Sequence, residues 1–111
     1  MYDGKTFRSV SNTSSGDVSS ETRFHYHQEG ELVWATYEGG AVRFGTLVAK
    51  AGDGGRLDMR YQHLTVDGEL KTGHCTSVPE TLSDGRLRLH ESWRWTSGSG
   101  ASGESVIEEV R

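Results

Sequence analysis

The sequence is poor in several features that define large classes of proteins. It has one cysteine and one proline in 111 residues, and its formal net charge is −4. A single cysteine excludes an internal disulfide framework. No apolar run is long enough for a transmembrane helix, and no lysine- and arginine-rich stretch supplies the basic patch used to bind nucleic acid. The first residues show no apolar signal sequence, so we expect a cytoplasmic protein with no membrane and no nucleic-acid partner.

Helical periodicity is also missing, and the repeating pattern is that of strands. Apolar and polar residues alternate in segments rich in β-branched and aromatic residues. Glycine, the most frequent residue with 15 copies, falls between these segments and marks turns. The pattern predicts eight strands, at about Thr6–Ser11, Val18–Gln28, Glu31–Glu38, Ala41–Lys50, Arg56–Val66, Glu69–Val78, Arg86–Thr96 and Glu104–Val110.

Three short glycine turns predict how neighbouring strands pair, because a two-residue turn fixes the register of a hairpin. Turns at Glu29-Gly30 and Gly39-Gly40 independently place the same side chains on one face, namely Val33, Ala35 and Tyr37, with Tyr26 and Phe44 across from them. A turn at Asp67-Gly68 places Tyr61, His63 and His74 on the inner face and Cys75 outside.

These hairpins predict an all-β domain over residues 1–111, built as a closed, eight-stranded antiparallel up-and-down β-barrel. Closure removes the free strand edges that would promote aggregation. A two-sheet β-sandwich made from the same hairpins is the alternative.

The lumen of such a barrel is the predicted functional site, and Glu91 is its most informative residue. Alternation along the seventh strand directs Glu91 inward between Leu89 and Trp93, where an isolated carboxylate is costly unless it is paired or protonated. Glu91 then either contacts a ligand in an aromatic pocket or bonds to its neighbours in a filled core. The candidate ligand-binding residues are Glu91, Trp93, Trp95, Tyr61, His63, His74, Tyr26 and Tyr37.

The outer wall carries a second candidate surface. Trp34 is expected to point outward opposite Gly45, where it either covers the exposed strand glycine or forms, with neighbouring apolar side chains, a patch typical of an interface. The candidate interface residues are Trp34, Leu32, Leu47 and His25. His25 and His27 have the spacing of a metal-binding pair, but they point outward and no further histidine completes a site, so no metal is expected.

Three stretches carry a resemblance to a known family: residues 7–12 with 18–22, residues 58–61, and Arg88-Leu89-His90-Glu91-Ser92-Trp93-Arg94-Trp95-Thr96-Ser97-Gly98. They resemble small bacterial proteins of about this length that often carry the label N-acetylglutamate synthase and are grouped with avidin-like barrels. The resemblance covers nearly the whole chain. It implies an avidin- or lipocalin-like meander with a loop-lined mouth, and often assembly through the barrel wall. Ser9, Ser11 and Asn12 resemble the small polar residues of the first avidin strand.

Two function classes follow, and a third comes from the family label. The first is a small-molecule-binding barrel, and the second is an oligomeric interaction protein with a packed lumen. The label suggests an acyl-transfer enzyme, but the Gln/Arg-x-x-Gly-x-Gly/Ala turn that binds acetyl-CoA does not occur, and no catalytic motif is found. We therefore expect no cofactor, a small-molecule ligand and a homo-oligomer.

Overall fold

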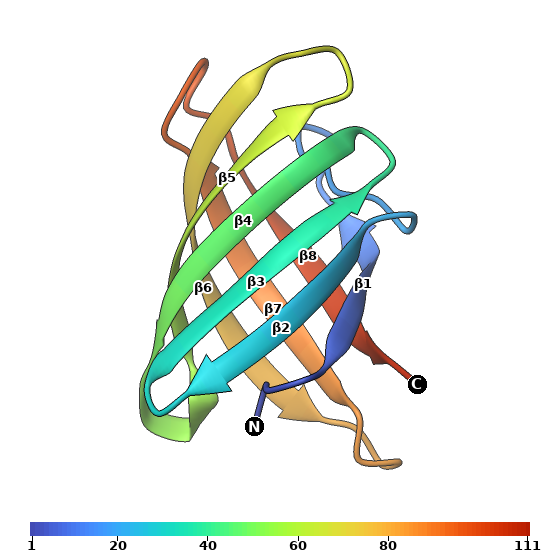
Figure 1. Cartoon of the computed structure of the whole chain (residues 1–111), viewed down its shortest axis with the longest axis vertical. Coiled ribbons are helices and arrows are strands. Elements are labelled where there is room, and N and C mark those ends of the chain that lie inside the picture. Colours follow the sequence, from blue (N-terminus) through green and yellow to red (C-terminus); the bar gives the residue numbers. More distant parts are fainter.

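The chain forms one closed barrel in which each strand pairs with its sequence neighbours (Figure 1). The computed structural model describes all residues, 1–111. The last strand pairs with the first, so the barrel prediction is confirmed and the sandwich alternative is wrong. The strands are β1 Thr6–Asn12, β2 Arg23–Glu29, β3 Leu32–Gly39, β4 Val42–Ala51, β5 Leu57–Thr65, β6 Leu70–Thr81, β7 Leu87–Trp95 and β8 Ser102–Val110, with a 3-10 turn, η1, at Asp53–Gly55.

The seam between β1 and β2 is the shortest in the barrel. Only Thr6, Phe7 and Arg8 pair with β2, whereas β1 pairs with β8 along its length, with a bulge between Ser9 and Ser11. The segment after β1 is therefore free to leave the wall. Residues 18–22, which the sequence predicted to begin the second strand, instead cross the upper end of the barrel.

Alternation places one face of every strand in the lumen, as a half-buried sheet requires. Val33, Ala35 and Tyr37 are each at most 2% exposed, which confirms their predicted inward orientation. On β7 the predicted alternation also holds, because Leu87, Leu89, Trp93 and Trp95 are buried and Glu91 is half-buried, whereas His90, Ser92 and Arg94 are exposed.

The β5–β6 hairpin departs from the prediction by one residue. Its turn pairs Thr65 with Glu69 and places Gly68 at a φ of 87°, so three residues rather than two separate the strands. A shift of one residue reverses every side chain of the second strand. His74 therefore faces solvent and Cys75 lies inside, the opposite of what the sequence predicted.

The β3–β4 hairpin differs for a related reason. Pairing shifts between Gly39↔Val42 and Tyr37↔Gly45, and the two residues of the bulge, Arg43 and Phe44, are both exposed. Beyond the bulge, Leu47 is only 6% exposed and faces the lumen. The prediction that Leu47 belongs to an outer patch is therefore wrong, and so is the inward placement of Phe44.

Glycines on the inner wall make room for aromatic rings on the neighbouring strand. Tyr37 packs on Gly45 and Tyr61 packs on Gly73, each so closely that a β-carbon on the glycine would overlap the ring. Such contacts are one of the uses of glycine inside a strand. They hold the rings against the wall at defined positions.

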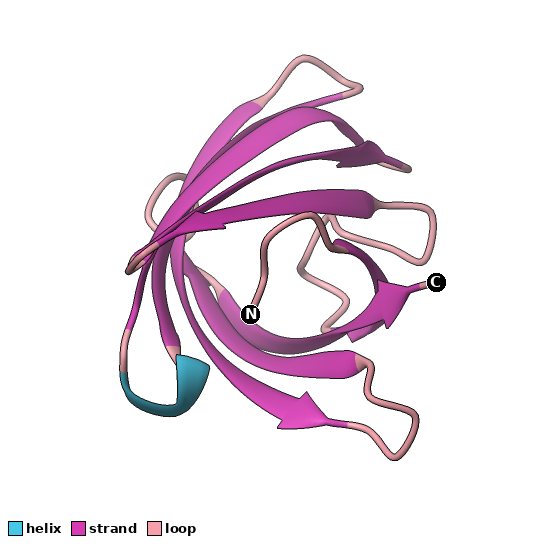
Figure 2. Cartoon of the chain, turned by 60° about the horizontal axis from the view of Figure 1, so that its bottom comes forward, coloured by secondary structure: helices cyan, strands magenta, loops and turns pink.

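The lower end of the barrel is closed by the segment before β1 (Figure 2). Tyr2 is fully buried there, packs near Tyr26 and donates a hydrogen bond to the carbonyl of Gly55 at 2.5 Å. The structure contains no helix with the length and apolar character of a membrane span.

Candidate functional site

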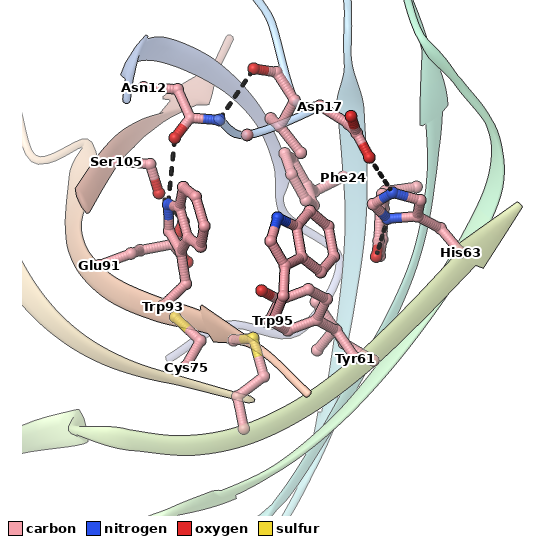
Figure 3. A pocket seen from close by; sticks show the side chains of 15 residues that line it. Asn12, Asp17, Phe24, Tyr61, His63, Cys75, Glu91, Trp93, Trp95 and Ser105 are labelled. Carbon is pink, nitrogen blue, oxygen red and sulfur yellow. Dashed lines mark hydrogen bonds and ion pairs between the residues drawn. The ribbon is translucent and has the colours of Figure 1, made fainter. Parts of the chain in front are cut away.

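A small cavity of about 50 Å³ lies in the upper part of the lumen (Figure 3). It is bordered by side chains from the barrel wall and by residues of the segment that crosses the mouth. Its lining residues are Asn12, Gly16, Asp17, Val18, Phe24, Tyr37, Leu47, Met59, Tyr61, His63, Cys75, Glu91, Trp93, Trp95 and Ser105.

Aromatic rings form much of the cavity wall. Trp95 has its ring centroid 5.6 Å from that of Tyr61, 5.4 Å from that of His63 and 5.7 Å from that of Trp93. The first two pairs meet edge to face, a favourable arrangement for aromatic rings. The cavity is thus bounded by a rigid apolar wall with indole N–H groups at its upper rim.

Residues 13–22, here called the strap, connect β1 to β2 and cover this rim. The strap is anchored by hydrogen bonds to lumen-facing side chains rather than by strand pairing. Trp93 Nε1 donates to Asn12 Oδ1 at 3.0 Å, and Asn12 Nδ2 donates to the Val18 carbonyl at 3.0 Å. Trp95 Nε1 donates to the Ser15 carbonyl at 3.3 Å. The cover of the lumen therefore rests directly on the two indoles that line it.

Asp17 makes the most strongly charged contact of the strap. Its Oδ2 lies 2.9 Å from His63 Nε2 and 3.0 Å from Lys71 Nζ, while Lys71 Nζ lies 4.9 Å from the centroid of the Trp95 ring. Burial raises the pKa of Asp17, but the hydrogen bonds from His63 and Lys71 outweigh it and hold the pKa below its ordinary value. Asp17 is thus held as a carboxylate between two donors.

Glu91 lies at the β7–β8 side of the cavity, where it is half-buried and also borders a hollow shared with Asn12 and the strap residue Thr13. Its Oε1 accepts a hydrogen bond from Ser105 at 3.0 Å. Burial raises the pKa of Glu91 from 4.5 to about 7, and the Ser105 bond offsets only part of this effect. A carboxyl group that gains and loses its proton near neutral pH can serve as a hydrogen-bond donor or as an acceptor.

Two further hydroxyls near Glu91 have no hydrogen-bond partner in the protein. Ser77 Oγ belongs to the cross-strand neighbour of Glu91 on β6, and Tyr26 OH lies in the buried core below. Burial and the negative charge of Glu91 raise the pKa of Tyr26 well above its usual value. Unpaired buried polar atoms are rare in native proteins, so this is a polar region within an otherwise apolar core.

The structure brings together most of the predicted lumen residues but not all of them. Glu91, Trp93, Trp95, Tyr61, His63 and Tyr37 line the cavity. Tyr26 is buried beneath it against Phe7 and Tyr2. His74 must be removed from the site, because it lies on the outer face.

On the outer wall, Trp34 and Leu32 are 37% and 45% exposed, and Trp34 stacks on His27 with 5.4 Å between ring centroids. The cross-strand neighbour of Trp34 on β4 is Val48, and the expected neighbour Gly45 lies inside under Tyr37. His25 bonds to Glu38 at 2.9 Å. No cluster of three histidine, cysteine or acidic side chains is arranged to hold a metal ion.

Several residues of the site were missed by the sequence analysis. Asp17 gave no signal as a partner of the lumen, because its role depends on the path of the strap, and Asn12 was noted only for its resemblance to the small polar residues of the first avidin strand. Cys75 and Leu47 were placed outside because of the two register errors. Burial raises the pKa of the Cys75 thiol, which is therefore a small apolar part of the wall rather than a reactive group.

Comparison with known proteins gives one match. The profile of the family described as Avidin-like protein matches residues 1–110. Neither a comparison with curated proteins nor one with solved structures finds a match.

Proposed function

The chain belongs to the avidin-like protein family, and from this premise we propose that it binds a small molecule in the upper lumen, between the strap and Glu91. The family and the closed barrel both fit a small-molecule-binding barrel. The proposed contacts are apolar packing against Trp93, Trp95 and Tyr61, and a polar contact to Glu91.

The observation that carries this proposal is the way the lumen is covered. A strap tied to two indoles, a histidine and a lysine by side-chain bonds closes a largely apolar cavity whose lining also includes the carboxyl group of Glu91. Ligand sites are typically apolar concavities with a few placed polar groups. The same barrel filled only for stability has no need of a half-buried carboxyl group facing its lumen, since partial burial already makes the charged form costly.

The volume of the cavity defines a condition for binding. At about 50 Å³ it holds a few water molecules, while sites for drug-sized ligands span roughly 300–1,000 Å³. A ligand of ordinary size therefore enters only when the strap moves outward. Moving it breaks side-chain bonds but no ladder of strand hydrogen bonds, because β2 begins only at Arg23.

Binding can be tested with one- and two-ring aromatic compounds, followed by tryptophan fluorescence and by thermal melting. We expect a saturable change in fluorescence and a higher melting temperature for at least one compound, since ligands that bind the folded state stabilise it. Cys75→Leu extends a larger side chain into the cavity and should abolish both effects. Val78→Leu, an outward change on the same strand, should leave them intact. Failure of every compound, even with a variant whose strap is shortened, would contradict the proposal.

A second function, assembly through the outer wall, is favoured by a specific observation. Trp34, Leu32 and Val48 are 37–51% exposed on β3 and β4, and Trp34 and Val48 are cross-strand neighbours. We propose that this patch forms a homo-oligomer interface, with His25 at its margin. Trp34→Glu should convert the oligomer to a monomer in light scattering, and a wild-type protein that is monomeric at high concentration would contradict this.

The remaining expectations stay predictions. They are a cytoplasmic location and a function that requires no cofactor. No contact in the lumen favours an acyl-transfer reaction over binding.

A further inference from the structure

The upper rim of the lumen presents hydrogen-bond donors, and the strap supplies the acceptors. Lys71 and the two tryptophans are donors only. His63 Nδ1 lies 2.9 Å from the Tyr37 hydroxyl, so its Nε2 is the atom that faces Asp17. The acceptors they meet lie on one short stretch of chain that runs from the end of β1 into the strap, and they are the Asn12 amide oxygen, the Ser15 carbonyl and the Asp17 carboxylate.

The donors around Asp17 are poorly solvated. The His63 side chain is 1% exposed and the Lys71 side chain 21% exposed. The other carboxylate near Lys71 belongs to Glu69, which lies 3.9 Å away and is 66% exposed. Removing Asp17 from this rim would leave partly buried donors and a positive charge without a close acceptor, which is strongly unfavourable.

Both oxygens of Asp17 are used. Oδ2 faces His63 Nε2 at 2.9 Å and Lys71 Nζ at 3.0 Å, while Oδ1 accepts from Lys71 at 3.2 Å. Directly below this group lie the Trp95 ring and the apolar cavity. A planar two-oxygen anion at the rim, joined to an apolar body beneath it, would therefore satisfy the same donors and fill the cavity.

We infer that the ligand of this barrel is a carboxylic acid with an apolar, ring-containing body, and that Asp17 occupies the position of its carboxylate when no ligand is bound. This inference rests on the proposed binding function and specifies its ligand class. The strap is then an internal competitor. A ligand carboxylate takes over the bonds to His63 and Lys71, Asp17 moves into solvent, and the body of the ligand packs on Trp95 and Tyr61.

The test uses benzoate and benzamide, which share a ring and differ in charge, with the wild type and Asp17→Ala. Asp17→Ala should tighten benzoate binding by about tenfold or more. In this variant benzoate no longer has to displace the Asp17 carboxylate from His63 and Lys71 before it can bind. Benzoate should also restore the melting temperature that Asp17→Ala loses. Benzamide should gain much less affinity and restore little. Fluorescence titration and thermal melting measure these effects.

Three further variants keep the test decisive. Glu69→Ala removes the exposed carboxylate near Lys71 and should leave benzoate affinity unchanged. Lys71→Met should abolish the preference for benzoate over benzamide while aromatic binding persists. If Asp17→Ala does not fold, Asp17→Asn keeps the shape, removes the charge and should show the same preference.

The outcomes separate the two proposals. Equal binding of benzoate and benzamide to Asp17→Ala would overturn the carboxylate assignment while binding in the lumen stands. Binding of neither compound, together with failure of the wider aromatic series, would overturn both.

Discussion

The two ends of this barrel are closed in physically different ways. At the lower end Tyr2 is fully buried in the aromatic core, and its hydroxyl and backbone N–H donate hydrogen bonds to the Gly55 carbonyl and to Gln28 Oε1. At the upper end the strap is held by several polar contacts around a cavity, among them the Asp17 ion pairs. Burial of a large apolar surface gives a closure that is costly to undo. Polar contacts at a rim can be exchanged for those of a ligand or of water.

Function and stability are therefore assigned to opposite ends of the barrel. The lower end should behave as part of the folded core, whereas the upper end should open at a cost well below that of global unfolding. Three predictions test this division.

The largest effect is expected at the lower end. Tyr2→Ala should lower the free energy of unfolding by about 3–5 kcal/mol, as large-to-small changes of buried aromatics do. Tyr2→Phe, which loses only the hydrogen bond to Gly55, should cost about 1 kcal/mol. Urea denaturation measures both. A loss below about 1 kcal/mol for Tyr2→Ala would show that the lower closure is as weak as the upper one.

An intermediate effect is expected at Glu91, in the form of pH dependence. Its folded-state pKa is about 7, above the ordinary value of 4.5. The folded state therefore holds this proton more tightly, so the contribution of Glu91 to stability is greatest below pH 4.5 and declines as pH rises through 7. The decline amounts to about 3 kcal/mol. Glu91→Gln, which cannot titrate, should remove this part of the pH dependence, as measured by unfolding at pH 5 and pH 8. Parallel curves for the two proteins would show that Glu91 is solvated.

The smallest effect on global stability is expected in the strap. Asn12→Ala removes the acceptor of Trp93 and the donor to the Val18 carbonyl. We expect a loss of about 1 kcal/mol in global stability but a clear rise in amide exchange over residues 13–22. Asn12→Asp keeps the acceptor and should give a smaller rise. Exchange that speeds up equally in β3 would mean that the strap and the wall open together.

The sequence was sufficient for the architecture and for part of the site. Alternation alone predicted the inward direction of Tyr37, Trp93 and Trp95, because a side-chain period of two is insensitive to small errors in strand ends. It failed for His74 and Leu47, where a turn of three residues or a bulge shifts the register and reverses a face. The sequence around Asp67-Gly68 is compatible with either length of turn.

The strap could not be predicted for a different reason. Val18 to Thr22 resembles a strand in composition, but a strand needs a partner, and β1 pairs with β2 only as far as Arg8. Whether a segment continues a sheet or crosses its end is decided by where a neighbour bends. The contacts of Asp17 with His63 and Lys71 join positions 46 and 54 residues apart, and no local pattern encodes them.

The pairing of the first strand with the last has a practical consequence for how this protein can be handled. Thr6 lies beside Val110, and both ends of the chain are at the end of the barrel opposite the strap (Figure 1). A tag or a surface linker at either terminus therefore leaves the mouth facing free solution. The same adjacency makes the chain a good subject for circular permutation: a short linker can join the old ends, and new ends can be placed in the strap. Such a permutant would keep all eight strands while cutting the cover of the lumen in two.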